Sequence, residues 1–192
     1  QAPARQAAIS GGIPISASCT TINKICGSGM MAAMLGHDML LADSCKRVIS
    51  GGFESMTNAP YLLSKARAGY RLGHETIIDH MLRDGLEDAY EYGKLMGHYA
   101  EDCAKEYGFS REDQDEFAIE SLTRATEAFE SGAFRDEITN VPIRNSKNKN
   151  QIMNDEEPLK ANIEKIPQLK PAFEENGTIT PANASSISDG AA

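Results

Sequence analysis

The sequence predicts an α/β core followed by a more acidic region. A strand, a helix and a second strand follow one another within about 35 residues, which is the pattern of a βαβ unit. The charge is uneven: residues 1–60 hold four Lys or Arg and three Asp or Glu, whereas residues 61–192 hold 15 and 25. The first region is therefore typical of a buried core, and the second of a more solvated part of the protein.

Composition narrows the class of protein. The chain has 192 residues, of which 41% are hydrophobic and 24% charged, as in ordinary globular proteins. A formal net charge of −9 argues against a nucleic-acid backbone as the main partner. Apolar runs are short and broken by polar residues, so no membrane span is predicted. The chain begins with Gln and stops on small residues, and we expect it to be a piece of a longer protein.

The elements of the first region can be assigned in order. Pro3 at a first helical position predicts a short helix over residues 4–10. The β-branched residues of 13–21 predict a strand. Residues 28–42 are mostly apolar and predict a helix buried on most sides, and 47–50 predict a short buried strand. The two strands of this unit are expected to be parallel.

Two helices are predicted next. Apolar residues at offsets of 3, 4, 7, 8 and 11 place an amphipathic helix over 92–107, ended by Gly108. Ser110, with Asp113 three residues later, is similar to a capping box and predicts a second helix, which ends at Gly132. Polar residues 145–158 predict a solvated loop or hairpin, and 178–180 predict a strand.

The four cysteines limit the possible chemistry. Cys19, Cys26, Cys45 and Cys103 form no Cys-x-x-Cys pair, which disfavours a zinc ribbon or a thioredoxin-type site. Four are too few for a disulfide scaffold of this length, so we expect a reducing compartment. Most of the thiols are expected to be buried as small hydrophobic groups, and Cys19, Cys45 and Cys103 to be structural.

Cys26 is the candidate nucleophile. It lies between a predicted strand and a predicted helix, where the helix N-terminus favours the thiolate. Gly27 and Gly29 add little bulk, so a ligand thioester could approach closely. A nucleophile on a tight strand-to-helix turn is suited to acyl transfer. The spacing alone leaves a buried, inert cysteine as the alternative.

Five segments carry a resemblance to a known family. Residues 23–30 (Asn-Lys-Ile-Cys-Gly-Ser-Gly-Met) resemble the nucleophile motif of the thiolases, the acetyl-CoA acetyltransferase family. The other segments, in the family's order, are 3–8, 51–61, 84–90 together with 96–97, and 182–190. Because these motifs extend over nearly the whole chain, the resemblance is specific.

The resemblance implies a fold. Thiolases consist of two similar α/β halves, each with a five-stranded mixed sheet, and a loop domain is inserted in the first half. This chain would then hold part of a layered α/β core with a mixed sheet. Residues 1–60 would belong to the N-terminal core, 61–173 to the inserted loop domain, and 174–192 to the chain re-entering the core.

The resemblance also implies an enzyme. Thiolases carry out the Claisen condensation of two acetyl-CoA to acetoacetyl-CoA and CoA, or the reverse thiolysis of a 3-ketoacyl-CoA. Cys26 would carry the acyl group, and its backbone N–H would help to bind the thioester oxygen. Coenzyme A thioesters are the substrates, and neither a resident cofactor nor a metal is implied. The family's Gly-His-Pro motif and second catalytic Cys do not occur here, so these 192 residues alone are expected to be inactive.

Three further residues match the family's substrate contacts. Leu86 and Met96 match residues that line the acyl and pantetheine pocket, and Ser185 matches a contact to the pantetheine arm. Without the resemblance, Leu86 and Met96 would be core residues and Ser185 a turn residue. The sequence departs from the family at Leu95, where short-chain members often have His, and at Ser186, where many have Gly. It also has one extra residue in the loop before Met96.

Several alternatives remain open. A thiolase-like protein could bind coenzyme A esters or lipids without turnover, and a β-ketoacyl synthase shares a cysteine at this turn. Glu54 could be an acid–base group, but we expect it to brace a strand end. The family implies a homodimer or homotetramer. We expect the cytoplasm as the compartment, with the mitochondrial matrix or the peroxisome as alternatives.

Overall fold

The computed structural model describes residues 1–143 and 151–192. The chain forms two compact units. Unit one consists of Gln1–Gly85 and Ile187–Ala192, and unit two of Leu86–Ser186. The prediction of a core over 1–60, a loop domain over 61–173 and a returning segment over 174–192 is a different division, and it stays a prediction.

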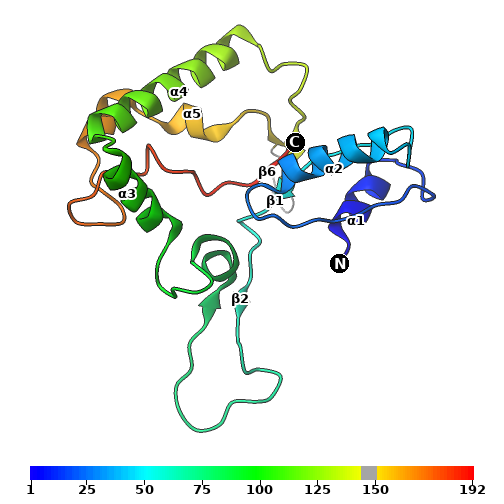
Figure 1. The fold of residues 1–192 in the computed structure, drawn as a ribbon, viewed down its shortest axis with the longest axis horizontal. Coiled ribbons are helices and arrows are strands. Elements are labelled where there is room, and N and C mark those ends of the chain that lie inside the picture. Colours follow the sequence, from blue (N-terminus) through cyan, green and yellow to red (C-terminus); the bar gives the residue numbers. More distant parts are fainter. Residues whose placement is uncertain (144–150) are drawn as a thin grey trace. The chain divides into compact units, whose positions relative to one another are not determined.

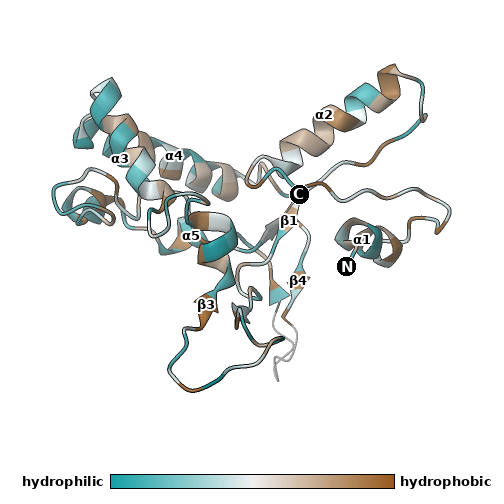
Figure 2. Cartoon of the chain, turned by 60° about the horizontal axis from the view of Figure 1, so that its bottom comes forward, coloured by the Kyte–Doolittle hydropathy of each residue, from teal (hydrophilic) through white to brown (hydrophobic). Residues whose placement is uncertain are grey.

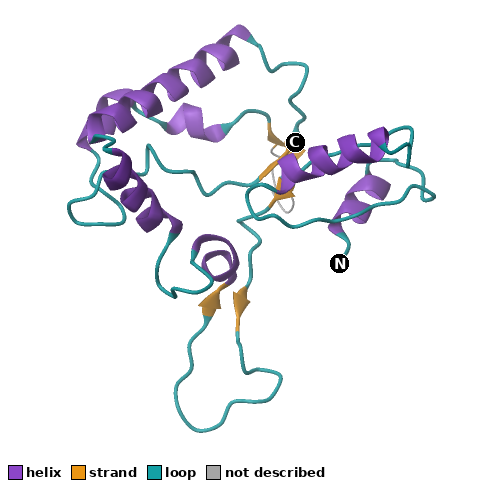
Figure 3. Ribbon diagram, viewed as in Figure 1, coloured by secondary structure: helices purple, strands orange, loops and turns teal. Residues whose placement is uncertain are grey.

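The described strands are short, and long connections join many of the elements (Figures 1 and 3). The helical elements, in chain order, are α1 (Pro3–Ser10), α2 (Ser28–Leu41), the π-helix η1 (Leu82–Leu86), α3 (Met96–Tyr107), α4 (Arg111–Ser131), α5 (Glu156–Lys160) and the 3-10 helix η2 (Ile163–Gln168). The strands are β1 (Phe53–Glu54), β2 (Tyr61–Leu62), β3 (Ile78–Asp79), β4 (Val141–Pro142), β5 (Gln151–Ile152) and β6 (Gly190–Ala191).

The described strands form three antiparallel pairs. β1 pairs with β6, β2 with β3, and β4 with β5. The prediction of a parallel βαβ unit over residues 13–50 was therefore wrong, and neither of its two predicted strands is present. The pairing of β4 with β5 agrees with a hairpin, one of the two predictions for the polar segment 145–158, although residues 145–150 lie outside the described residues.

The segment 13–21 is not a strand in the structure. Two of its carbonyl groups, those of Ile15 and Ala17, accept hydrogen bonds from the guanidinium group of Arg5 on α1, at 3.1 and 3.3 Å. The hydroxyl of Thr21 accepts the backbone N–H of Ala4 at 3.3 Å. The Arg5 side chain thus binds carbonyl groups that this segment would direct to a neighbouring strand in a sheet, and the first turn of α1 contacts the same segment.

The predicted strand over 47–50 is also absent, and the pairing begins a few residues later. Gly52 exchanges two backbone hydrogen bonds with Ala192, at 2.9 and 3.0 Å, and β1 follows directly. The hydroxyl of Ser50 donates to the carbonyl of Ala32 in α2 at 3.0 Å. The segment before β1 therefore packs on α2 instead of pairing in a sheet.

Helix α2 is confirmed, but its burial is not. It spans Ser28–Leu41, close to the predicted 28–42, and its residues are mostly apolar (Figure 2). Gly36 is its one buried residue, whereas Met30 is 75% and Leu41 74% exposed in the described chain. The apolar composition of this helix correctly predicted its position in the sequence, but most of its large apolar side chains are exposed in the described chain.

Helices α3 and α4 confirm the predicted helix pair and both predicted ends. Gly108 and Gly132 end the two helices in the left-handed conformation, with φ of 69° and 73°. Ser110 and Asp113 form a reciprocal capping box at the start of α4. Helix α3 begins at Met96 instead of 92, because the chain before it forms a closed loop described below.

Unit two has a small core that contains charged groups. The buried hydrophobic, polar and charged residues of the described chain all belong to this unit: Ala104, Ala118, Ile166, Ile179, Glu101, Asp115 and Thr180. Residues 178–180 do not form the predicted strand. Instead, their backbone N–H groups bind side chains, as described in the next subsection.

Candidate active site

Cys26 lies on a turn just before α2, and its side chain is exposed. Gly27 caps the helix, and its N–H donates to the carbonyl of Lys24 at 3.0 Å. The hydroxyl of Ser28 closes the turn: it accepts the N–H of Lys24 and donates to the carbonyl of Ile25, both at 2.8 Å. Cys26 is therefore not buried in the described chain, in contrast to one alternative, and its thiol is open to a reagent.

The residue before Cys26 has an unusual backbone. Ile25 lies in the left-handed region with φ of 50°, which is rare for a β-branched residue. The side-chain oxygen of Asn23 accepts the N–H of Ile25 at 2.9 Å. Together with the two bonds of Ser28, this contact holds the peptide that leads into Cys26.

Small residues let the chain after α2 pass close to the start of that helix. A Cβ on Gly52 would lie 3.4 Å from the Cα of Gly29, and a Cβ on Gly36 would lie 2.7 Å from the hydroxyl of Ser50. Gly29, Ala32 and Gly36 are spaced by three and four residues, so they share one helix face. This face accepts residues 48–52 and fixes α2 relative to the segment that precedes β1.

The motif after that segment is held by an aspartate that sequence reasoning missed. Oδ1 of Asp189 accepts the N–H of Thr57 at 2.9 Å, and Oδ2 lies 3.5 Å from the hydroxyl of Ser55. These hydrogen bonds, above all that from the Thr57 backbone, lower the pKa of Asp189. Glu54 pairs in β1 with Gly190 and accepts the N–H of Ser55 at 3.2 Å, as expected of a brace at a strand end.

Leu86 and Met96 are brought together by a closed loop. An isolated antiparallel bridge joins Glu87 to Leu95, and the N–H of Asp88 donates to the carbonyl of Lys94 at 2.9 Å. Leu86 and Met96 are the residues just outside this bridge, so they lie at the same end of the loop. Leu86 is half-buried and Met96 is exposed, so the reading of Met96 as plain core is wrong for the described chain.

The loop between them is stabilised by its own charges. The carboxylate of Asp88 accepts the N–H groups of Glu91 and Tyr90, at 2.7 and 2.8 Å, and these bonds lower its pKa. The ammonium group of Lys94 lies 4.1 Å from the centre of the Tyr99 ring. The Lys94 end of the loop thus packs on α3.

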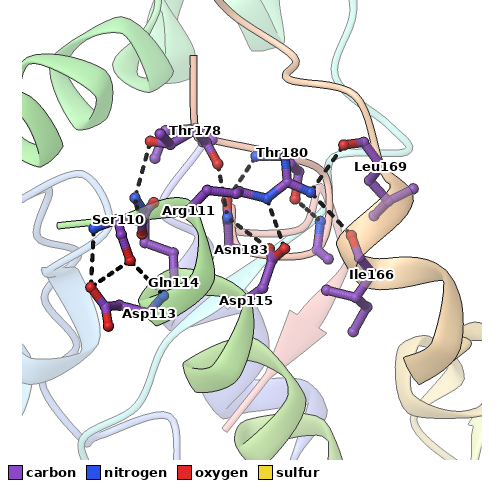
Figure 4. A network of polar contacts seen from close by, with 12 residues as sticks. Ser110, Arg111, Asp113, Gln114, Asp115, Ile166, Leu169, Thr178, Thr180 and Asn183 are labelled. Atoms are coloured by element: carbon purple, nitrogen blue, oxygen red, sulfur yellow. Dashed lines mark hydrogen bonds and ion pairs between the residues drawn. The ribbon is translucent and has the colours of Figure 1, made fainter. Parts of the chain in front are cut away.

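Ser185 is exposed and follows a turn, residues 178–184, whose backbone groups bind side chains, among them that of Asn183 (Figure 4). Glu101 of α3 accepts the backbone N–H groups of Thr178 and Ile179. Asn183 bonds both Thr180 and Thr178 within the turn. The turn therefore has a fixed shape up to the residue before Ser185.

Sequence reasoning missed Glu101, Asp115 and Asn183 as well as Asp189. A signal for Glu101 was present: it lies four residues after Gly97 and three before Ala104, on a face of α3 with two small residues. The remaining thiols agree only in part with expectation. Among the free cysteines, Cys19 and Cys45 are half-buried, but Cys103 is exposed, so its expected burial was wrong.

The four predicted site residues belong to different units. Cys26 lies in unit one, and Leu86, Met96 and Ser185 lie in unit two. Leu86 and Met96 are neighbours at the loop bridge, and each of the other two lies on its own turn. In the part of the chain that the structure describes, no helix is both long and apolar enough to cross a membrane.

Comparison with known proteins identifies the family of this chain. The family profile described as "Thiolase, N-terminal domain" matches residues 1–192. The chain belongs to the thiolase family, and the predicted thiolase-like α/β fold class is confirmed.

Individual relatives carry a more specific name. A probable acetyl-CoA acetyltransferase of Dictyostelium discoideum is 50% identical over the whole chain, which covers 46% of that protein. The acetyl-CoA acetyltransferase of Schizosaccharomyces pombe is 45% identical and 49% covered. The thiolase Acat5 of Ascaris suum, solved in complex with coenzyme A, matches the whole chain with a TM-score of 0.88 at 41% identity, and 48% of it is covered. The chain spans about half the length of the relatives it matches.

Proposed function

We propose that this chain supplies the nucleophile of an acetyl-CoA C-acetyltransferase. The observation that carries the proposal is Cys26, an exposed thiol on a turn held by Asn23 and Ser28, in a chain that is similar throughout to acetyl-CoA acetyltransferases. An exposed thiol before a helix N-terminus has the access and the local dipole that an acyl acceptor needs.

The proposed reaction has two steps. The Cys26 thiolate attacks the carbonyl carbon of one acetyl-CoA; a new C–S bond forms, and the bond to the coenzyme A sulfur breaks. A base then takes a proton from the methyl group of a second acetyl-CoA, and the resulting carbanion attacks the acetyl group on Cys26. The Cys26 thiolate leaves, and acetoacetyl-CoA is formed. Thiolysis of a 3-ketoacyl-CoA is the same sequence in reverse.

The substrate contacts are assigned to unit two. Leu86 and Met96, neighbours at the bridge from Glu87 to Leu95, would give an apolar wall for the acyl group and the end of the pantetheine arm. Ser185, exposed at the end of its turn, would contact the pantetheine arm itself. The base and the residue that activates Cys26 would come from the rest of the protein, since the relatives are about twice as long as this chain.

The assembly and the compartment belong to the same proposal. A homodimer or homotetramer is the assembly that the family resemblance implies. The exposed apolar residues of α2 are compatible with packing against further protein. We place the protein in the cytoplasm, with the mitochondrial matrix or the peroxisome as the other compartments that the family resemblance allows.

The test is acetyl transfer to Cys26 in the full-length protein. After brief exposure to acetyl-CoA, peptide mass spectrometry should find the acetyl group on Cys26. Cys26→Ser should lower kcat for thiolysis by about 10³-fold or more, because a hydroxyl is a far weaker nucleophile than a thiolate. Cys103→Ser, which changes another exposed thiol, should leave turnover unchanged.

Other outcomes identify the alternatives. Acetylation of another residue, or full activity of Cys26→Ser, would refute the role of Cys26. A protein that binds coenzyme A esters with neither acetylation nor turnover would be the non-catalytic binder. Transfer to an acyl carrier protein in place of coenzyme A would indicate a β-ketoacyl synthase.

A further inference from the structure

The turn that leads to Ser185 is not held by its own backbone alone. Within residues 178–184, the N–H groups of Asn183 and Ala184 donate to the carbonyl of Thr180, at 3.2 and 3.0 Å. From outside the turn, the N–H of Ala172 donates to the carbonyl of Ile179 at 2.9 Å. Side chains supply further contacts, and one of these side chains, Asn183, belongs to the turn itself (Figure 4). Asn183 is separated from Ser185 by a single residue.

Both the oxygen and the nitrogen of the Asn183 side-chain amide form hydrogen bonds within the turn. Its oxygen accepts the N–H of Thr180 at 2.7 Å, and its nitrogen donates to the carbonyl of Thr178 at 3.1 Å. The same nitrogen lies 3.5 Å from Oδ1 of Asp115 on α4. An amide offers one acceptor group and two donor hydrogens, and here both kinds of group have partners. Asn183 therefore spans the turn from inside and joins it to α4.

Asp115 is itself fixed. Only 4% of this residue is exposed, and its Oδ2 accepts the Nε–H of Arg111, one helical turn earlier, at 2.8 Å. A second guanidinium nitrogen of Arg111 donates to the carbonyls of Ile166 and Leu169, at 3.1 and 2.9 Å. An ion pair with a buried carboxylate and all of these partners has little freedom to move. The contact between Asn183 and Asp115 therefore holds the turn against α4.

We propose that Asn183 is a positioning residue for coenzyme A binding: it fixes Ser185 by locking the preceding turn to the Arg111–Asp115 pair. The proposal rests on the proposed function, in which Ser185 contacts the pantetheine arm. Asn183 acts through the turn and through Ser185, so its contribution is to the affinity for the arm and not to the chemistry at Cys26.

The chemistry of the site explains why an amide stands here. Aspartate at 183 would keep an acceptor for Thr180, but it would lose the donor to Thr178 and place a second carboxylate next to Asp115. Two carboxylates at that distance, one of them buried, repel strongly. Alanine would remove every bond of the residue-183 side chain and leave the end of the turn held by the backbone bonds to the Thr180 carbonyl. Serine would keep a short acceptor but no contact with Asp115.

The experiment compares Asn183→Ala and Asn183→Ser with wild type in the full-length enzyme. For acetoacetyl-CoA and acetyl-CoA, KM should rise about tenfold, the effect of losing one or two hydrogen bonds of ordinary net strength, while kcat stays within about threefold. For S-ethyl acetothioacetate, a thioester without the pantetheine arm, kcat/KM should not change. Alkylation of Cys26 by iodoacetamide should proceed at the wild-type rate.

A matched control and a binding measurement complete the design. Asn162→Ala removes a side-chain cap at the start of η2, where Oδ1 accepts the N–H of Glu164 at 3.0 Å, and it should leave all of these constants unchanged. The Kd for coenzyme A, measured by calorimetry, should rise by the same factor as KM. Asn183→Asp should weaken binding more than Asn183→Ser does.

The outcomes separate the two proposals. Unchanged KM and Kd in the Asn183 variants would overturn the positioning role. So would an equal fall of kcat/KM for the substrates with and without the arm, because a general loss of structure would affect both. A wild-type protein that binds coenzyme A without turnover would contradict the proposed function, and the ratio of Kd values would still test Asn183. A wild-type protein that does not bind coenzyme A would overturn both.

Discussion

Glu101 offers a direct test of how unit two is stabilised. It is 1% exposed, and its carboxylate accepts the N–H of Thr178 at 2.8 and 2.9 Å, the N–H of Ile179 at 2.8 Å and the hydroxyl of Thr178 at 3.1 Å. Burial by itself raises the pKa of Glu101, but the bonds from Thr178 and Ile179 outweigh it, and the pKa lies below its usual value. Gly177 leaves room for this approach, since a Cβ there would collide with the carboxylate.

Glu101→Gln should destabilise the turn by about 2–4 kcal/mol. The change keeps the size of the side chain, but one oxygen becomes an NH₂ group that faces backbone donors. Hydrogen bonds to a charged acceptor contribute about 1.5–3 kcal/mol each, and a buried donor left unpaired costs about 1–3 kcal/mol. The value of about 2–4 kcal/mol corresponds to weakening two of the hydrogen bonds to the Glu101 carboxylate, while the bonds to the remaining oxygen are kept.

The assay is hydrogen exchange at the Thr178 and Ile179 amides of the full-length protein, followed by mass spectrometry. A loss of about 2–4 kcal/mol in the free energy of local opening corresponds to roughly 30- to 1000-fold faster exchange at neutral pH. Glu106→Gln, the same chemical change at an exposed position of α3, should leave exchange at these amides unchanged. Equal exchange in wild type and Glu101→Gln would refute the reasoning.

The pH dependence has a definite sign. A carboxyl group with a lowered folded-state pKa stabilises the folded state fully above its unfolded pKa, which is about 4.3 for Glu. That stabilisation is lost as the pH falls through the lower folded-state value. The difference in thermal stability between wild type and Glu101→Gln should therefore be constant near neutral pH and shrink below about pH 4. A difference that grows on acidification would contradict the assignment.

Two further changes test the local structure through thermal unfolding of the full-length protein. Ser110→Ala removes the N-cap of α4, whose hydroxyl also helps to lower the pKa of Asp113, and should cost about 1 kcal/mol, whereas Ser121→Ala on the exposed side of the same helix should be neutral or slightly stabilising; equal effects would refute the cap. Gly97→Ala would drive a Cβ into the ring of Phe173 and should cost about 1–3 kcal/mol, and Phe173→Leu in the same chain should recover part of the loss; additive losses would refute this contact.

The helices show how far local sequence reasoning reaches. Ser110 and Gly132 bound α4 as predicted, and Gly108 ends α3. The start of α3 was misplaced by four residues, because the apolar pattern continued into the loop closed between Glu87 and Leu95. Periodicity does not distinguish a helix from a loop that packs on the same side.

The strands show where that reasoning stops. Residues 13–21 have the composition of a strand, but their carbonyls at Ile15 and Ala17 bind Arg5 instead of a neighbouring strand. One pairing that does form joins β1 to β6, which lie far apart in the sequence. A strand is completed only by hydrogen bonds from another segment, and no local pattern identifies that segment.

For the candidate site, the sequence by itself determined the turn of Cys26 and the motifs that indicate a thiolase. The contacts of Asp189 with Ser55 and Thr57, and the buried positions of Glu101 and Asp115, were decided only by the tertiary structure. The physical reason is the range of the interactions. Helix hydrogen bonds and caps join residues three or four apart, so a short stretch of sequence specifies them. Strand pairing, burial and the partners of a buried carboxylate join residues far apart in the chain, so they exist only once the chain has folded.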